Sequence, residues 1–145
     1  MTDSLRVERT FDAPAQAVFD ACTNPEVMRR WWHAGPDWET TVAELDLRVG
    51  GAFRISMRRP DGREHTATGE YTVVDPPRRL AFTWTWADPR DAPGESLVEL
   101  DFDERDRATT VVLRHSGLPD ADAVRSHTEG WKEVLANLAN KVLEA

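Results

Sequence analysis

The sequence contains a single cysteine, Cys22, so no disulfide bond can form within the chain. Basic residues are also scarce, because 18 Lys and Arg stand against 26 Asp and Glu and give a formal net charge of -8. Nucleic acids and anionic membranes attract proteins with a basic face, and we therefore expect neither of them as a partner.

Long hydrophobic runs are absent too. No apolar stretch approaches the ~20 residues that span a bilayer, and the first residues carry neither the basic nor the apolar region of a signal peptide. A lone cysteine is typical of proteins from a reducing compartment. We therefore expect a cytoplasmic protein whose 145 residues form one domain, either a monomer or a homodimer.

The residue patterns of common catalytic and metal sites are missing as well. The four histidines form no HxxxH motif and do not combine with cysteine at zinc-ligand spacing, so no metal is expected. Cys22 lies on the apolar face of a predicted helix, where a thiol is packed and inert. No serine stands in a nucleophile elbow. We assign no catalytic residue and no cofactor, and an enzyme is the less favoured interpretation.

What the sequence does contain is a long amphipathic segment at its C-terminal end. Over residues 120–145 the apolar residues recur at intervals of three, four and seven, which predicts one apolar stripe on a helix of about 22 residues. The stripe consists of Val124, Trp131, Val134, Leu135, Leu138, Val142 and Leu143.

The chain before this helix alternates apolar and polar residues with a period of two, as half-buried antiparallel strands do. Phe53, Ile55 and Met57, for example, alternate with polar neighbours. A longer loop with two prolines is expected to be mobile, and a polar turn precedes the last strand. The pattern predicts strands near 5–11, 39–47, 52–59, 64–75, 79–87, 95–102 and 109–116, the loop at 88–94 and the turn at 104–107.

Two short helices are predicted between the first two strands. Pro14, with Asp12 or Ala13 as N-cap, begins a helix that ends near residue 21. Asn24-Pro25 repeats the signal for a helix that runs to about Trp31. The elements together predict an α+β fold, in which a curved antiparallel sheet of six or seven strands wraps around the long C-terminal helix. The space between sheet and helix is the natural place for a ligand.

Several motifs, in this order and spacing, resemble the START-like helix-grip superfamily, also called SRPBCC. Within it, the chain is similar to the branch homologous to the activator of the heat-shock-protein-90 ATPase. The resemblance covers essentially the whole chain. The motifs that carry it are Phe11-Asp12-Ala13-Pro14, Asn24-Pro25-Glu26 with Trp31-Trp32, Gly50-Gly51, Gly69-Glu70-Tyr71, Asp75-Pro76-Pro77, His115-Ser116-Gly117-Leu118, and His127 with Gly130-Trp131.

The resemblance implies a cavity between the sheet and the C-terminal helix, often for apolar or lipid-like ligands. Members of this superfamily range from binding proteins to cyclases, so the fold alone does not select a function. The residues that we expect to line a ligand site are Trp32, Phe53, Ile55, Met57, Tyr71, Trp84, Trp86, His127 and Trp131.

Three of the features in this region allow two interpretations. The tryptophans form either a filled core or the wall of a cavity. His127, four residues before Trp131 on the same helix face, is either a hydrogen-bonded structural histidine, which we favour, or a ligand contact. Gly130 costs about 1 kcal/mol in a helix interior, and either lets the helix approach a strand closely, which we favour, or opens space for a ligand.

The favoured function is that of a binding protein for an apolar or amphipathic small molecule, such as a lipid-like or aromatic compound. The first alternative is a cyclase or dehydratase acting on a polyketide or aromatic substrate, with His127 or Tyr71 as the acid/base group. The second alternative, which the family resemblance implies, is a protein-interaction module that binds the chaperone. It is favoured least because we identify one START-like domain and no separate N-terminal domain of the kind the chaperone activators carry.

Overall fold

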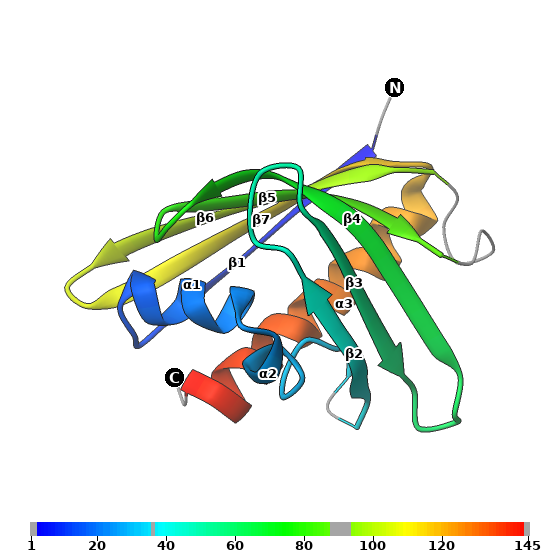
Figure 1. The fold of residues 1–145 in the computed structure, drawn as a ribbon, viewed down its shortest axis with the longest axis horizontal. Coiled ribbons are helices and arrows are strands. Elements are labelled where there is room, and N and C mark those ends of the chain that lie inside the picture. Colours follow the sequence, from blue (N-terminus) through cyan, green and yellow to red (C-terminus); the bar gives the residue numbers. More distant parts are fainter. Residues whose placement is uncertain (1–2, 36, 88–93, 144–145) are drawn as a thin grey trace.

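A computed structural model describes residues 3–35, 37–87 and 94–143. In these residues seven strands and three α-helices follow one another in the predicted order, and a π-helical turn, η1, is the last element described (Figure 1). The expected loop at 88–94 lies almost entirely outside the described residues. The elements are β1 (Asp3–Phe11), α1 (Ala15–Thr23), α2 (Pro25–Met28), β2 (Glu39–Leu45), β3 (Ala52–Arg58), β4 (Glu64–Asp75), β5 (Arg79–Trp86), β6 (Ser96–Arg105), β7 (Ala108–Leu118), α3 (Ala121–Leu138) and η1 (Ala139–Leu143).

The strands form one antiparallel sheet in the order β1-β7-β6-β5-β4-β3-β2. The first strand therefore lies beside the last, while strands two to seven follow the chain. The sheet curves, and α3 runs diagonally across its concave side, with α1 and α2 at one end (Figure 1). The predicted α+β helix-grip architecture is confirmed.

The core lies between the concave face of the sheet and α3. On β3 the side chains of Phe53, Ile55 and Met57 are buried, as the period of two predicts. From α3 the apolar stripe contributes Trp131, Val134, Leu135 and Leu138, and all four are buried. Among the described residues, no helix is long and apolar enough to cross a membrane.

The predicted N-cap of the first helix, Asp12 or Ala13, was wrong. Pro14 itself is the N-cap of α1, and no side chain next to it in sequence accepts a hydrogen bond from the first turn. The backbone N–H of Ala15 donates instead to the carboxylate of Glu104 at 2.7 Å. A residue from the distant end of β6 thus supplies the acceptor that helix N-termini need, and local sequence rules cannot find such a partner.

The second helix begins as predicted, with Asn24 accepting from the N–H of Glu26, but it ends at Met28 and does not reach Trp31. Both Trp31 and Trp32 are buried. Trp31 donates from its indole to the carbonyl of Ala21 on α1, while Trp32 faces the sheet and α3. On a helix, consecutive side chains point about 100° apart. Backbone outside a helix is not bound to this angle, so it can direct the two consecutive indoles to different places in the core.

The ends of the later elements also differ from the prediction. The turn between β6 and β7 is only two residues long, Asp106 and Arg107, which have φ of 51° and 67°. This geometry is that of a tight hairpin turn, and it lets both strands extend further than expected.

α3 is 18 residues long rather than about 22, because the chain widens into the π-helical turn at Ala139.

Candidate functional site

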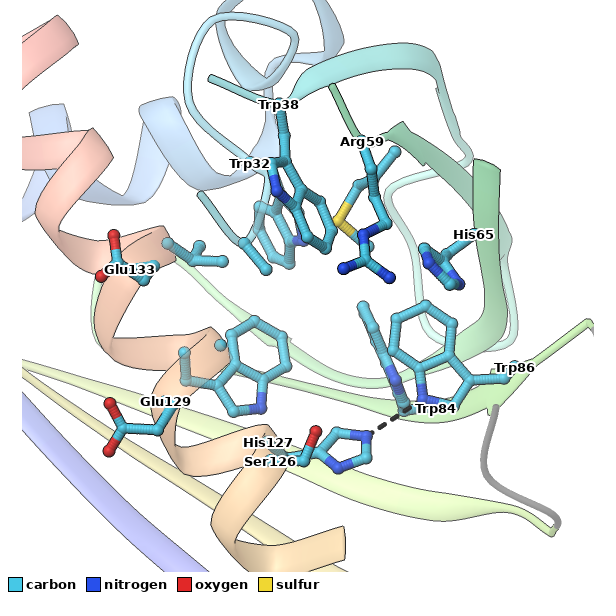
Figure 2. A pocket seen from close by; sticks show the side chains of 15 residues that line it. Trp32, Trp38, Arg59, His65, Trp84, Trp86, Ser126, His127, Glu129 and Glu133 are labelled. Carbon is cyan, nitrogen blue, oxygen red and sulfur yellow. Dashed lines mark hydrogen bonds between the residues drawn. The ribbon is translucent and has the colours of Figure 1, made fainter. Parts of the chain in front are cut away.

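A pocket of about 430 Å³ opens between α3, the strands β3 to β5 and the segment that follows α2 (Figure 2). Its volume lies within the range of small-molecule sites, about 300–1,000 Å³. Five of the six tryptophans of the chain line it. The lining indoles belong to Trp32, Trp38, Trp84, Trp86 and Trp131.

Six of the nine residues expected at a ligand site line this pocket: Trp32, Met57, Trp84, Trp86, His127 and Trp131. The other three, Phe53, Ile55 and Tyr71, are buried deeper in the core. Phe53 packs against Tyr71 and Phe82, with ring centroids 5.7 and 5.2 Å apart. Period two correctly indicates which face of β3 is buried. It does not indicate where along the strand the pocket opens, and Phe53 lies about 13 Å from Met57 at 3.3 Å per residue.

Tyr71 does not line the pocket, and burial raises the pKa of its hydroxyl well above the ordinary value. Cys22 is buried on α1, and burial raises the pKa of its thiol to about 12. This agrees with the expected inert, packed thiol.

His127 lies in the pocket wall with both ring nitrogens occupied. The indole N–H of Trp86 donates to Nε2 at 3.0 Å (Figure 2). Because Nε2 accepts, Nδ1 carries the proton and donates to the carbonyl of Ala123 at 2.7 Å. Burial lowers the pKa of His127, although the bond to Ala123 opposes this. The side chain is therefore neutral, and it holds the indole of Trp86 in place.

His115, on β7, has the opposite tautomer. The indole of Trp131 donates to Nδ1 at 3.0 Å. Nε2 therefore carries the proton and donates to the hydroxyl of Ser96 at 2.7 Å, and that hydroxyl donates to the carbonyl of Trp84 at 3.0 Å. Burial, together with nearby His127, lowers the pKa of His115 to about 3. We call this sequence of bonds the indole–histidine chain, which fixes Trp131 to the sheet.

The sequence did not predict that His115 and His127 would meet. Their rings lie 5.2 Å apart and nearly perpendicular. One comes from a strand and the other from the helix that crosses it, so their proximity follows from the crossing point rather than from any spacing in the sequence.

The mouth of the pocket contains a stack of three side chains whose position there the sequence did not predict. The guanidinium of Arg59 lies 5.4 Å from the ring centroid of Trp38. Trp38 in turn stacks on His65 at 6.0 Å and 21°, and His65 meets the ring of Trp86 edge-on at 6.2 Å. The sequence did indicate the direction of Arg59, because this residue continues the alternation of Phe53, Ile55 and Met57 and so falls on the same face.

The remaining lining residues come mainly from α3 and include two acidic side chains, Glu129 and Glu133, which are exposed. Of the remainder, only Val134 belongs to the stripe predicted from the sequence. Among the described residues, the other lining residues are Ala34, Ser126, Glu129, Gly130, Glu133 and Val134.

Gly130 does not bring the helix unusually close to a strand, so the favoured interpretation was wrong. A Cβ atom at this position would lie 3.7 Å from the Cβ of Ala34, which is ordinary van der Waals contact. Ala34 belongs to the segment after α2, not to a strand. Gly130 lines the pocket, and this geometry matches the alternative, an open space beside the helix.

Two indole N–H groups in the pocket wall, those of Trp32 and Trp84, are buried and have no hydrogen-bond acceptor among the residues that the structure describes. Both rings meet Trp131 edge-to-face, with centroids 6.0 and 5.2 Å apart. In the part of the chain that the structure describes, no group of three or more His, Cys, Asp or Glu side chains could hold a metal ion.

The family model described as activator of Hsp90 ATPase homolog 1-like protein matches residues 12–142. Among solved structures, protein CV1439 from Chromobacterium violaceum is similar, with 26% identity, a TM-score of 0.87 and coverage of 98% of this chain and 97% of that one. The AHSA1 protein from Silicibacter pomeroyi is 30% identical, with a TM-score of 0.82 and coverage of 95% and 96%.

A curated relative is the uncharacterized protein C1711.08 from Schizosaccharomyces pombe. It is 25% identical over 121 residues, which make up 81% of this chain. The match spans only 31% of the length of that relative.

Proposed function

We propose that this chain, which belongs to the family of activator of Hsp90 ATPase homolog 1-like proteins, binds an aromatic or otherwise flat apolar small molecule between α3 and the sheet. The observation that carries the proposal is the pocket of about 430 Å³ walled by five indoles. Such a wall leaves apolar surface facing water, at a cost of about 25 cal/mol per Å². A flat ligand would remove that surface from water and stack on the rings.

The unpartnered indole N–H groups of Trp32 and Trp84 support the same proposal. A buried donor without an acceptor costs about 1–3 kcal/mol. An oxygen atom on a bound ligand that reached either group would offset this cost.

Binding is better supported than turnover. A general acid or base needs a nitrogen or oxygen that can exchange a proton with the substrate. Both ring nitrogens of His127 are engaged by Trp86 and Ala123, and Tyr71 lies outside the pocket. No feature of the pocket favours a cyclase or dehydratase role for these two residues.

The experiment is a fluorescence titration of the purified protein with N-phenyl-1-naphthylamine, a neutral aromatic probe. We expect saturable binding, with emission changes from both the probe and the indoles. The blocking variant is Gly130→Leu, whose side chain would extend into the pocket from α3. The matched control is Arg125→Leu, which places the same side chain on an exposed position of the same helix.

We expect the affinity of Gly130→Leu to fall at least tenfold and that of Arg125→Leu to stay within about twofold. Thermal unfolding provides the second readout, since a ligand at 100 times its Kd stabilises a fold by about 2.7 kcal/mol. Equal affinity in the two variants would place the probe elsewhere and overturn the proposal. If the probe does not bind and the protein instead stimulates the ATPase of Hsp90, the chaperone-binding alternative would replace it.

A further inference from the structure

We infer that the ligand carries a negative charge, so that the pocket selects aromatic anions such as carboxylates and sulfonates, with Arg59 as the residue that binds the charge. This inference rests on the proposed function, because it names the chemical class of ligand for the same pocket. It arises from the placement of the charged side chains around the hollow.

The first observation is the position of Arg59. Its side chain is half-buried at the mouth, with the guanidinium over the ring of Trp38. Figure 2 shows this guanidinium turned into the space between Trp32 on one side and Trp84 and Trp86 on the other. Contact with an indole face orients the guanidinium plane and leaves N–H donors free for another acceptor.

The second observation is that Arg59 forms no ion pair within the part of the chain that the structure describes, although the chain has eight more acidic than basic residues. The neighbouring Arg58 points to the other face of β3 and pairs with Glu39 at 2.7 Å. Two adjacent arginines thus differ: one is neutralised on the surface, and the other faces the pocket without a carboxylate.

The third observation concerns the acidic residues of the lining. Glu129 and Glu133 are exposed on α3, and Figure 2 shows their carboxylates directed away from the hollow. Arg59 is therefore the one charged lining side chain, among those described, that is turned inward. Its positive charge sits where water is partly excluded, and a charge-assisted hydrogen bond there is stronger than one on the surface.

A cation is the competing ligand, because cages of aromatic rings bind quaternary ammonium groups through cation–π contacts. Here the face of Trp38 is already covered by Arg59. A second cation in the same hollow would meet the guanidinium and be repelled. A carboxylate or sulfonate would accept two parallel N–H bonds from it, while its aromatic body lies against the indoles.

The test compares probes that share one ring system. The anionic probe is 1-anilinonaphthalene-8-sulfonate, the neutral one is N-phenyl-1-naphthylamine, and the cationic one is trimethyl(1-naphthyl)ammonium. Their dissociation constants are measured on the wild type and on Arg59→Gln, Arg59→Lys and Arg63→Gln. Arg63→Gln is the matched control, because it removes the same charge from an exposed residue four positions away, in the turn after β3.

We expect the wild type to bind the sulfonate on the order of tenfold more tightly than the neutral probe, as a charge-assisted pair would give. Arg59→Gln should abolish this preference, Arg59→Lys should retain part of it, and Arg63→Gln should keep it. Higher salt should weaken binding of the sulfonate and leave the neutral probe unchanged. If Arg59→Gln fails to fold, the probe preference and salt series on the wild type still test the charge of the ligand, and Arg59→Lys tests the residue.

The outcomes separate the two proposals. If the wild type binds none of the probes, the proposed function fails and this inference fails with it. If the neutral probe binds, and the sulfonate is not preferred or Arg59→Gln leaves the preference intact, the inference is overturned while the binding function stands. Tighter binding of the ammonium probe would also overturn it.

Discussion

The two ends of β3 border regions that are built differently, although one strand supplies both. Around Phe53 the rings of Phe53, Tyr71 and Phe82 interlock, with centroids 5.2 to 6.0 Å apart. Around Met57 the indoles surround an open pocket. The first region is filled and the second is hollow.

Hydrogen bonds to ring nitrogens are one difference between the two regions. In the filled region, apolar rings pack against each other and nothing holds them apart. In the hollow region, Trp131 is bonded to His115 and Trp86 to His127, so these indoles are anchored to the wall rather than free to collapse inward. The comparison teaches that polar partners behind the aromatic wall hold two of its five indoles, Trp86 and Trp131, in place.

The largest expected effect comes from breaking the filled region. Phe82 is almost fully buried and touches Phe53, Tyr71, Trp32 and Trp84. We expect Phe82→Ala to lower the free energy of unfolding by about 3–5 kcal/mol, because it leaves a cavity. Chemical denaturation measures the change.

The comparison variant is Trp86→Phe in the hollow region. It removes the hydrogen bond to His127 but keeps an aromatic ring, and it should cost about 1–3 kcal/mol. Equal losses in the two variants would contradict the distinction between a filled and a hollow region.

A pH effect should arise in the hollow region from His115. Its folded pKa, about 3, lies below the unfolded value of 6.5. As the pH falls below 6.5, the unfolded chain binds a proton that the folded chain does not, so stability decreases with falling pH. Between pH 6.5 and 5 the expected loss is about 2 kcal/mol, at 1.36 kcal/mol per pKa unit.

Urea denaturation at pH 7 and pH 5 tests this, with His115→Gln as the variant that should lose the part of the dependence that comes from His115. His33 adds a parallel effect, since burial lowers its pKa to about 4, and it remains in both proteins. The same pH dependence in His115→Gln and wild type would rule out His115 as its source.

A smaller effect of opposite sign should follow from Gly130→Ala. An added Cβ meets only Ala34 at 3.7 Å, so the variant should gain about 1 kcal/mol of stability from helix propensity. The matched control is Gly62→Ala, where φ is 90° and the same substitution should destabilise. Thermal unfolding compares the three proteins. A loss of stability in Gly130→Ala would mean that the helix is packed more tightly there than the geometry indicates.

The smallest effect should come from Arg58→Gln. The ion pair with Glu39 is exposed, with the two side chains 46% and 67% accessible. Surface pairs contribute about 0–1 kcal/mol, so the stability should hardly change and probe binding should not change at all. A clear change in binding would mean that charge on either face of β3 acts on the pocket, and would weaken the distinction between Arg58 and Arg59.

Much of this fold was predictable because it rests on periodicity. The strand faces and the apolar stripe of α3 follow from spacings of two and of three to four residues, which are properties of neighbours in sequence. The end of α2 and the cap of α1 were not predictable, since the first depends on where Trp31 and Trp32 are buried and the second on a carboxylate 89 residues away.

The candidate site was predictable only in part for the same reason. Spacing indicated that Met57 and Phe53 share a face, but it could not tell which of the two borders a pocket. His115 lies on β7, His65 lies on β4 and Arg59 directly follows β3, and only the fold of the sheet brings them around the indoles. Trp38, Arg59, His65 and His115 were therefore not predicted at the site, whereas His127 was.

The pairing of β1 with β7 has a consequence for the order in which the chain folds. Phe11 pairs with Thr109, and Leu5 with His115, so the first strand finds its neighbour only after almost the whole sequence has been made. Residues 3–11 leave the ribosome early, and β1 then has no partner strand until the six later strands have been synthesised. Contacts so distant in sequence close slowly. We expect β1 to dock late and the hairpins from β2 to β7 to form before it.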